Sequence, residues 1–533
     1  MKNIESGKVT IASLILGFVF PRKFENSALG INGMRTLCCL SFFCALCLAP
    51  ITGHTQDNEL PEDFELLERC ETDLASEGRN YPSFQPYHCP DTSEGVFNLR
   101  QDFPTEIADE HLPWIDVDFT SESERYADIV LQYAFEGNIQ NDFDVQKNVV
   151  RDWYHAPWQH HDSISCGNGR EYHHGLTRER PIPPFEFHDD QTDDLEAWAI
   201  GFYNQTGAVT LGNVWPGFGQ DPDVDAAEFA EGTVAFKLLF TDAGPNGDVE
   251  RQLPFLDGTV QWTANIYPIQ PYPGHSRREH LCFNDGREKR IDRPVYLTQI
   301  DIAVKDDRSP VGWVFGTFLY NANKADAWES SDPVFNQWNR FDVVGLSWGD
   351  DSDVSLMKNM PGAFVNPALQ ETWLNPELIA VQSEVAENQA YMKFHGLGGR
   401  LNGPVDNPVS SCMSCHGRAG LARNDLTVRH PMGIWETWME KTSTRATINQ
   451  DVFEKYFGFM PPGGRSDGGY VFFDYSMQVA FGIQNRAKMD VLKERVQNEG
   501  VVLEALPFDL EVLNPPGISG IADRGGSLND PIE

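Results

Sequence analysis

The chain has 533 residues, of which 79 are acidic and 41 basic, so its formal net charge is -38 at pH 7. Such a surface repels phosphate backbones and anionic lipid headgroups, which argues against nucleic acid and the membrane surface as partners. Hydrophobic residues make up 41% and aromatic residues 12% of the chain, as in globular proteins. We therefore expect two or three folded domains and partners that are basic or neutral.

Residues 1–56 are interpreted as an upstream extension followed by an export signal. Met34-Arg35 begins a short basic start, Leu37–Leu48 is an apolar run of twelve residues, and small and polar residues follow. A membrane span needs about 20 residues, so this order is typical of a signal peptide rather than a transmembrane anchor. A buried core helix is the alternative. We expect a bacterial protein that is exported to the periplasm or secreted.

Six cysteines remain after that segment, and two of them belong to a motif described below. The other four are expected to form up to two disulfides in an oxidising compartment. Of the three possible pairings, Cys70–Cys89 with Cys166–Cys282 closes the most local loops. Free buried thiols are the alternative.

Residues 57–370 are predicted to form a mainly antiparallel β domain, shaped as a sandwich or jelly roll. A helix is expected near Glu122–Glu136, after an acidic and turn-rich start. Strands at short spacing pair with their neighbours, which favours antiparallel sheets. A glycan or a small molecule is considered as the ligand of this domain. Four segments are rich in β-branched and aromatic residues and are predicted strands: Thr233–Phe240, Thr259–Ile266, Val295–Val304 and Val311–Tyr320.

Six of the 14 histidines lie in one short window before residue 189, which raises the question of a metal or second redox site. Neighbouring histidines in sequence point their side chains apart, and no H-E-x-x-H pattern accompanies them. Surface and interdomain packing is therefore favoured over a metal site. The six are His155, His160, His161, His173, His174 and His188.

After about residue 366 the pattern changes from strands to helices. Pro376–Lys393 starts with a proline and acidic residues, as helices do, and Gly433–Glu440, Gln450–Tyr456 and Tyr475–Asn498 are further candidates. We expect an all-α domain over residues 371–515 and a loosely ordered tail over residues 516–533. The predicted fold class is therefore α+β and multidomain.

One motif carries chemistry. Cys412, Cys415 and His416 form C-x-x-C-H, the pattern of c-type haem attachment. Two thiols at this spacing reach the two vinyl groups of one porphyrin, and the adjacent imidazole becomes the proximal ligand of the iron. A thioredoxin-like redox pair would need a buried strand before the motif, where Leu401–Ser410 is a polar loop. A structural zinc site would need a second ligand pair, which the mature sequence lacks.

With this motif, about residues 376–510 resemble the class I cytochrome c family. The resemblance rests on Cys412-Met413-Ser414-Cys415-His416 and implies an all-α fold with one covalent haem c that exchanges electrons with a redox partner protein. It also implies that the Pro431 carbonyl accepts the Nδ1 proton of His416. A methionine sulfur from a later loop is the usual distal ligand, and Met460, followed by two prolines, matches it. Alternatives are an open position or Met432, Met439, Met477, His395 and His430.

Three further segments, Gly169–Arg180, Gly316–Tyr320 and Leu401–His416, are similar to parts of large bacterial proteins that end in one c-type haem domain. That resemblance implies no activity. The sequence as a whole predicts a periplasmic or secreted c-type cytochrome, an electron-transfer protein rather than a catalyst. Two alternatives remain: a haem enzyme of the peroxidase type with an open distal position, and an extracellular ligand-binding protein with an accessory haem.

Overall fold

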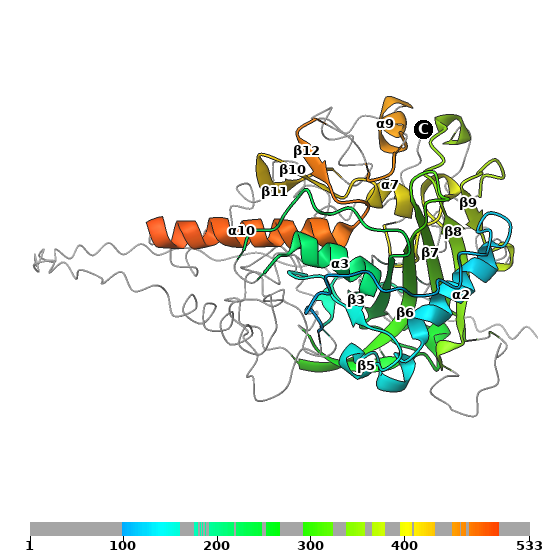
Figure 1. Ribbon diagram of the computed structural model, residues 1–533. Coiled ribbons are helices and arrows are strands. Elements are labelled where there is room, and N and C mark those ends of the chain that lie inside the picture. The colour runs from blue at the N-terminus through cyan, green and yellow to red at the C-terminus, as the bar shows by residue number, and fades with distance from the viewer. Residues whose placement is uncertain are drawn as a thin grey trace, which may run out of the picture. The chain divides into compact units, whose positions relative to one another are not determined.

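A large antiparallel β-sheet organises the part of the chain that the structure describes (Figure 1). All described residues belong to one compact unit, Asn58–Glu533. The predicted export segment, the four cysteines of the predicted disulfides and the predicted tail lie outside them. The computed structural model describes residues 99–159, 175–179, 182, 184, 187, 191–193, 195–217, 220–247, 252–266, 291–322, 324, 337–357, 365–378, 395–407, 410–431, 450–458, 460–464 and 468–499.

The large sheet has nine strands, and every pair is antiparallel. The order is β1-β3-β4-β6-β7-β8-β9, with β2 also paired to β3 and β5 also paired to β6. The four predicted strands are confirmed as β4, β5, β6 and β7. The strands are β1 (Trp153–Tyr154), β2 (Thr177–Arg178), β3 (Ala197–Asn204), β4 (Val234–Thr241), β5 (Gln261–Ile266), β6 (Ile291–Lys305), β7 (Trp313–Tyr320), β8 (Phe341–Ser347) and β9 (Thr372–Leu374).

The helices are short except for one. The described α-helices are α2 (Ser123–Phe135), α3 (Gln205–Val214), α7 (Cys412–His416), α9 (Gln450–Tyr456) and α10 (Met477–Glu499). The predicted helices at residues 122–136, 450–456 and 475–498 are confirmed as α2, α9 and α10. Of the helix predicted at residues 376–393 only the helical start, 376–378, is described, and residues 433–440 lie outside the described part. Within the described residues, no helix is both long enough and apolar enough to span a bilayer.

The predicted fold class is wrong: in the residues that the structure describes, the C-terminal part contains a second β-sheet and the β part is one nine-stranded sheet rather than a sandwich. Three strands, β10 (Gly420–Ala422), β11 (Asp425–Arg429) and β12 (Tyr470–Phe472), form a second antiparallel sheet in the order β11-β10-β12, and α10 packs against it. Strands of three to five residues have no apolar alternation long enough to detect. The described fold is mostly β-sheet with few helices. The independence of residues 57–370 and 371–515 as domains stays a prediction.

The large sheet is covered on both faces because its strands alternate in the direction of their side chains. On one face Phe236 and Leu238 of β4 and Ile300 of β6 pack with Val130 of α2. Each such side chain stabilises the fold by about 1.5–3 kcal/mol when it leaves water. On the other face the core contains residues of the large sheet, α3, α7, the small sheet and α10: Tyr203, Leu211, Trp313, Phe315, Met413, Leu421, Val471, Val479 and Ile483.

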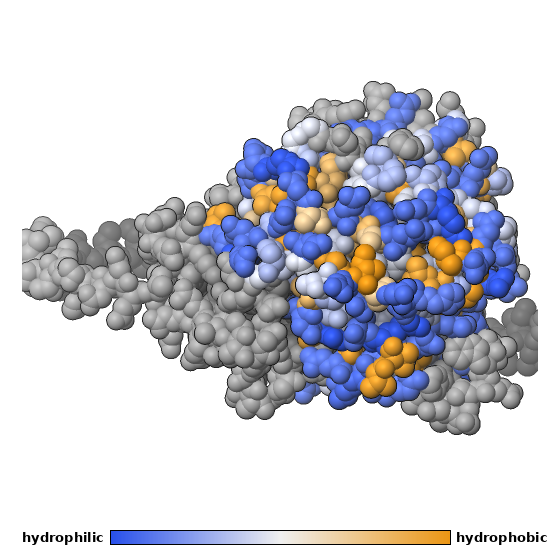
Figure 2. Space-filling view, in the orientation of Figure 1, coloured by the Kyte–Doolittle hydropathy of each residue, from blue (hydrophilic) through white to orange (hydrophobic). Residues whose placement is uncertain are grey.

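The surface seen in Figure 2 is mainly hydrophilic, with apolar side chains scattered over it. The large apolar side chains that are exposed among the described residues are Ile107, Val149, Val150 and Val491. They do not make up a broad apolar patch of the kind that marks a protein or membrane interface.

Candidate functional site

The C-x-x-C-H motif forms the short helix α7. Ser411 is the N-cap, and its side chain accepts a hydrogen bond from the Ser414 amide at 3.3 Å. Positions three residues apart share a helix face, so Cys412 and Cys415 lie one turn apart on the same side. Both cysteines are intermediate in exposure. Two thiols on one helix face match the requirement for thioether bonds to one porphyrin.

One face of strand β7 contacts both ends of this helix. Trp313, Phe315 and Thr317 occupy every second position of the strand, so they point to the same side of the sheet. The Phe315 ring centroid lies 4.6 Å from that of His416. The Thr317 hydroxyl, which donates to Asp301 at 2.9 Å, also lowers the pKa of the Cys412 thiol, against the larger effect of burial. The alternation along β7 therefore sets the place of α7 on the sheet.

His416 is in the protonation state that binds iron. Its Nδ1 lies 2.9 Å from the Tyr475 carbonyl oxygen. A carbonyl only accepts hydrogen bonds, so Nδ1 carries the proton and Nε2 keeps its lone pair. Burial lowers the pKa of His416 to about 4, although the bond to Tyr475 acts in the opposite direction. The imidazole is therefore neutral at pH 7 and offers Nε2 as a ligand atom.

The surroundings of Cys412 do not resemble those of a reactive redox thiol. Burial raises the pKa of Cys412 well above its ordinary value, and the nearby Asp406 and Asp301 carboxylates raise it further. A reactive cysteine needs a lowered pKa, because the thiolate is the nucleophile. No strand leads into α7, since residues 401–407 are loop. The site therefore lacks both features of a thioredoxin-like pair.

Pro431 does not hold His416 in this structure. Its carbonyl lies 3.0 Å from Nδ1 of His430 and 3.5 Å from Nη1 of Arg418. The chain after α7 turns directly into β10 and β11, which carries Pro431 away from the motif. The Tyr475 carbonyl occupies the position that the class I resemblance assigned to Pro431. The sequence contains no signal for this acceptor, because every residue has a backbone carbonyl.

Met460 lies beside the motif helix. It is completely buried, and a Cβ atom placed on Gly417 would come 2.6 Å from the Met460 sulfur. Gly417 directly follows His416 in the backbone, so Met460 packs against the C-terminal end of α7. Here the sulfur fills space against α7, as buried methionines often do. The role of Met460 as distal ligand stays a prediction.

The other candidates for the distal position are placed in different surroundings. The Met477 sulfur lies 3.9 Å from the Cys415 sulfur. The His430 ring packs against the rings of Tyr470 and Phe472. His395 is buried, and burial lowers its pKa to about 4. Met432 and Met439 lie outside the described residues.

A row of polar side chains lies beside the motif and was not predicted from the sequence. Lys237 of β4, Asp301 of β6 and Thr317 of β7 are direct cross-strand neighbours on the face that carries α7. Gln299 donates from Nε2 to Asp301 at 2.8 Å and to Asp406 at 3.1 Å. Burial, followed by the Asp406 charge, raises the pKa of Asp301 to about 7. Only the strand register brings these residues together, and the register could not be derived from the sequence.

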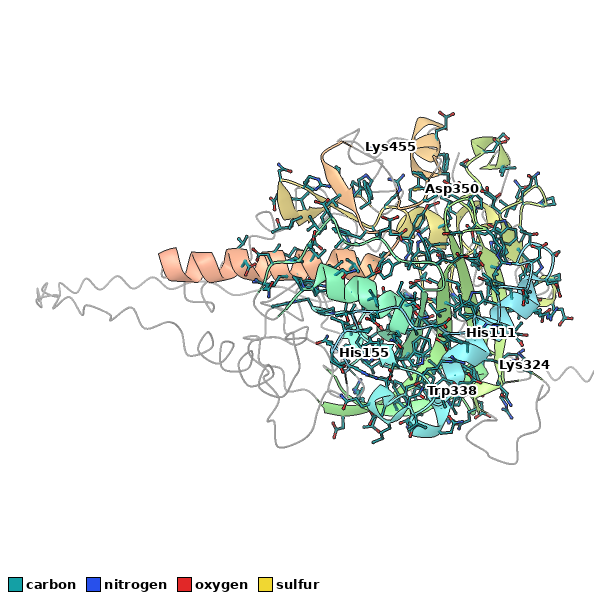
Figure 3. All side chains as sticks on the ribbon, viewed as in Figure 1. His111, His155, Lys324, Trp338, Asp350 and Lys455 are labelled. Atoms are coloured by element: carbon teal, nitrogen blue, oxygen red, sulfur yellow. The ribbon has the colours of Figure 1, made fainter. Side chains whose placement is uncertain are left out.

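The histidine-rich window contributes no metal site to the described part of the chain. His155 is buried, its Nδ1 accepts a hydrogen bond from the Arg100 amide at 3.0 Å, and its ring lies 4.9 Å from that of Phe202. His155 lies well apart from Asp350 (Figure 3). The other five histidines are outside the described residues. Among the residues that are described, no group of three or more His, Cys, Asp or Glu side chains is arranged around one metal ion.

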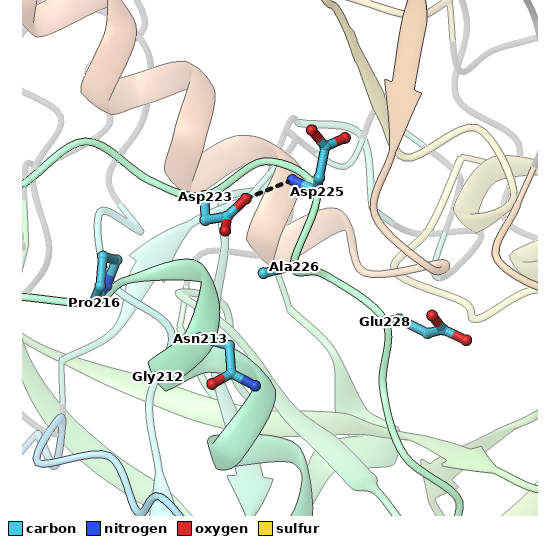
Figure 4. A pocket seen from close by; sticks show the side chains of 7 residues that line it. All are labelled: Gly212, Asn213, Pro216, Asp223, Asp225, Ala226 and Glu228. Atoms are coloured by element: carbon cyan, nitrogen blue, oxygen red, sulfur yellow. Dashed lines mark hydrogen bonds between the residues drawn. The ribbon is translucent and has the colours of Figure 1, made fainter.

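An open surface hollow of about 590 Å³ lies at the end of α3 (Figure 4). Asp223 accepts a hydrogen bond from the Asp225 amide at 3.1 Å, and Asp225 forms an ion pair with Arg423 at 2.8 Å. The residues that line the hollow include no cysteine or histidine, so they offer no thiol or imidazole to a haem. The lining residues are Gly212, Asn213, Pro216, Asp223, Asp225, Ala226 and Glu228.

The residues of the motif fit a haem c. Two thiols share one helix face, and a neutral imidazole has its Nδ1 proton engaged and its Nε2 free for iron. The likeness to class I cytochromes covers the motif and does not extend to the fold, because β10, β11 and β12 replace helices. No protein-family model, no curated protein and no solved structure matches the chain.

Proposed function

We propose that this protein is an exported c-type cytochrome that transfers single electrons through one covalently bound haem c. Cys412 and Cys415 would form the two thioether bonds, and Nε2 of His416 would ligate the iron. When bound, the haem supplies a one-electron couple between ferric and ferrous iron. The observation that carries the proposal is the hydrogen bond between His416 and the Tyr475 carbonyl, next to two cysteines on one face of α7.

The chain's own residues support this role in three ways. The Tyr475 carbonyl orients the His416 ring and raises its basicity as a ligand. Phe315 packs against the same ring and keeps water from one side of it. The acidic surface attracts a basic redox partner and speeds its encounter with the protein.

A second candidate function is favoured by the position of Met460. Its buried sulfur packs against α7 beside Gly417, so the helix already occupies its surroundings. A haem without a strong distal ligand binds peroxide or carbon monoxide, as haem enzymes of the peroxidase type do. The spectrum of the wild-type protein and of Met460→Ala separates the two functions. A near-infrared sulfur-to-iron band that is lost in Met460→Ala supports the cytochrome with Met460 as ligand.

The test of the proposal is to express the exported protein with a working haem-ligation system. We expect a red protein whose colour stays with the polypeptide after acidic acetone extraction. The variant with Cys412→Ser and Cys415→Ser should release any haem into the solvent, and the wild type made without the ligation system should remain colourless. Haem that is extracted from the wild type as readily as from the double variant would contradict the proposal.

A further inference from the structure

The turn that presents the Tyr475 carbonyl has an unusual backbone. Asp474 and Tyr475 are consecutive residues with positive φ, 42° and 65°, and neither is glycine. Side chains rarely adopt this left-handed region, because the Cβ atom crowds the backbone carbonyl. Such strain persists only where the surrounding structure fixes the residues in place, and it often occurs at functional sites. The contacts of Asp474 and Tyr475 show what holds their backbone in this conformation.

The Asp474 carboxylate is held by three donors from distant parts of the chain. Nζ of Lys305 lies 2.9 Å from both carboxylate oxygens, and Nε1 of Trp313 donates to one of them at 2.9 Å. The Phe229 amide donates to the other at 2.9 Å. Asp474 is only 2% exposed, so water does not compete for these bonds. A buried carboxylate with an ammonium group and two N–H donors is fully satisfied.

Two of these donors belong to the large sheet. Lys305 and Trp313 are direct cross-strand partners at the ends of β6 and β7. Sheet strands are rigid, so the Asp474 carboxylate is tied to a fixed point of the fold. The next residue, Tyr475, has a buried ring, and its carbonyl accepts from Nδ1 of His416. The sheet is therefore linked to His416 by hydrogen bonds to the Asp474 carboxylate, by the backbone from Asp474 to Tyr475, and by the hydrogen bond from His416 to the Tyr475 carbonyl.

We propose that Asp474 is a positioning residue that sets the electron donation of His416 to the haem iron. Tied to the sheet by Lys305 and Trp313, it keeps the Tyr475 carbonyl against Nδ1. A hydrogen bond at Nδ1 makes the imidazole a stronger donor, which favours ferric iron and lowers the reduction potential. This inference rests on the proposed haem attachment. A purely structural Asp474 would neutralise Lys305 and leave the potential unchanged.

The experiment compares three variants with the wild type. Asp474→Asn removes the charge that binds Lys305, and Trp313→Phe removes a single donor while keeping a ring. Asp306→Asn is the matched control, because Asp306 is also buried, but its carboxylate accepts from Tyr126 at 2.9 Å and from Arg308 at 2.6 Å rather than from the donors around Asp474. We expect the potential to rise in the first two variants, by about 59 mV for a tenfold change in the one-electron equilibrium in Asp474→Asn and by less in Trp313→Phe. The control should lose stability without a change in potential.

A second measurement is independent of the haem. The ¹⁵N resonances of His416 in the apoprotein report which ring nitrogen carries the proton. We expect Nδ1–H in the wild type and in Asp306→Asn, and a mixture of both tautomers in Asp474→Asn and Trp313→Phe. Unchanged tautomers together with unchanged potentials would overturn the role of Asp474. If no haem attaches to the wild type, the proposed function fails, and the tautomers alone decide the positioning. If Asp474→Asn does not fold, Trp313→Phe decides the question.

Discussion

At the scale of single residues, the site depends on protonation states that burial controls. His416 is neutral because burial lowers its pKa to about 4, and Cys412 stays a thiol because burial raises its pKa. Both shifts have desolvation of the charged form as their largest cause. A neutral imidazole and a protonated Cys412 thiol are therefore properties of the fold and not only of the residues themselves. On the same face of the sheet, burial also raises the pKa of the Asp301 carboxyl group, and this shift can be measured.

Asp301 makes the protein less stable as the pH rises. Its folded-state pKa is about 7 against an ordinary value of 3.8, so between these values the folded protein holds a proton that the unfolded chain has lost. The free energy of unfolding therefore falls as the pH rises through this window. Asp301→Asn should remove about 1–2 kcal/mol of that fall, a reduced figure because the side chain is partly exposed. Urea unfolding at pH 5 and pH 8 measures it.

The control for this experiment is Asp118, whose pKa is lowered by hydrogen bonds from Thr120 and Ser121. Its contribution to stability is present above its ordinary pKa and is lost as the pH falls. Asp118→Asn should therefore leave the difference between pH 5 and pH 8 unchanged. An equal difference in Asp301→Asn and the wild type would show that Asp301 is ionised throughout this range.

Tyr475 allows side chain and backbone to be separated at one residue. Its hydroxyl donates to the Pro461 carbonyl at 3.4 Å, a long bond, while its own carbonyl accepts from His416 at 2.9 Å. Tyr475→Phe removes only the first bond, so we expect a loss of less than about 1 kcal/mol in stability. The His416 tautomer should not change, because a backbone acceptor survives the substitution. Denaturant unfolding and ¹⁵N NMR measure the two effects.

At the scale of elements, α7 is placed by close packing on both sides. β7 lies on one side, through Phe315 and Thr317, and Met460 lies against the end of the helix at Gly417. The contact between Gly417 and Met460 leaves no room for a methyl group added at residue 417. Since well-packed interiors resist such additions, the packing of the helix can be tested by filling this contact.

Gly417→Ala should destabilise the protein by about 1–3 kcal/mol. The new Cβ would lie 2.6 Å from the Met460 sulfur and 3.1 Å from the Met413 carbonyl oxygen, which is backbone and cannot move aside cheaply. Gly468→Ala is the control, because no atom lies within 4 Å of its added Cβ and its φ is not in the positive region. Thermal unfolding of both variants checks this. Equal stability of the two variants would mean that Met460 does not pack where the structure places it.

At the scale of the whole molecule, the net charge of -38 should govern encounters with redox reagents. Attraction between exposed charges is screened over about 8 Å at physiological ionic strength. We therefore expect the rate of electron exchange with a cationic metal complex to fall as salt is added, and the rate with an anionic complex to rise. Stopped-flow kinetics with both reagents, and with an uncharged one as control, measures this. Rates that do not depend on salt would show that the charge lies away from the site of electron exchange.

The sequence predicted the elements of the fold better than their assembly. Strand β7 has eight residues of β-branched and aromatic character, and that local signal was sufficient. The strand β10 has three residues, and nothing in Gly420–Ala422 distinguishes it from a turn. The C-terminal part was predicted to be all-α for this reason: its longer helices give a recognisable pattern in the sequence, and its short strands do not.

In the candidate site, too, the local motif could be predicted from the sequence, whereas its distant partners could not. The spacing of Cys412, Cys415 and His416 is a local property, so it could be recognised without a structure. The partners of the motif come from far along the chain, and they depend on strand register or on backbone atoms. Thr317 and Asp301 meet Cys412 through the register, and Tyr475 contributes a carbonyl that any residue could offer.

The most direct test of the account is the intact mass of the exported protein, purified under denaturing conditions after expression with a haem-ligation system that is shown to work on another cytochrome. We expect the mass of the mature polypeptide plus one haem for the wild type, and the polypeptide mass alone for the variant with Cys412→Ser and Cys415→Ser. A wild-type protein with the bare polypeptide mass would show that no haem is attached.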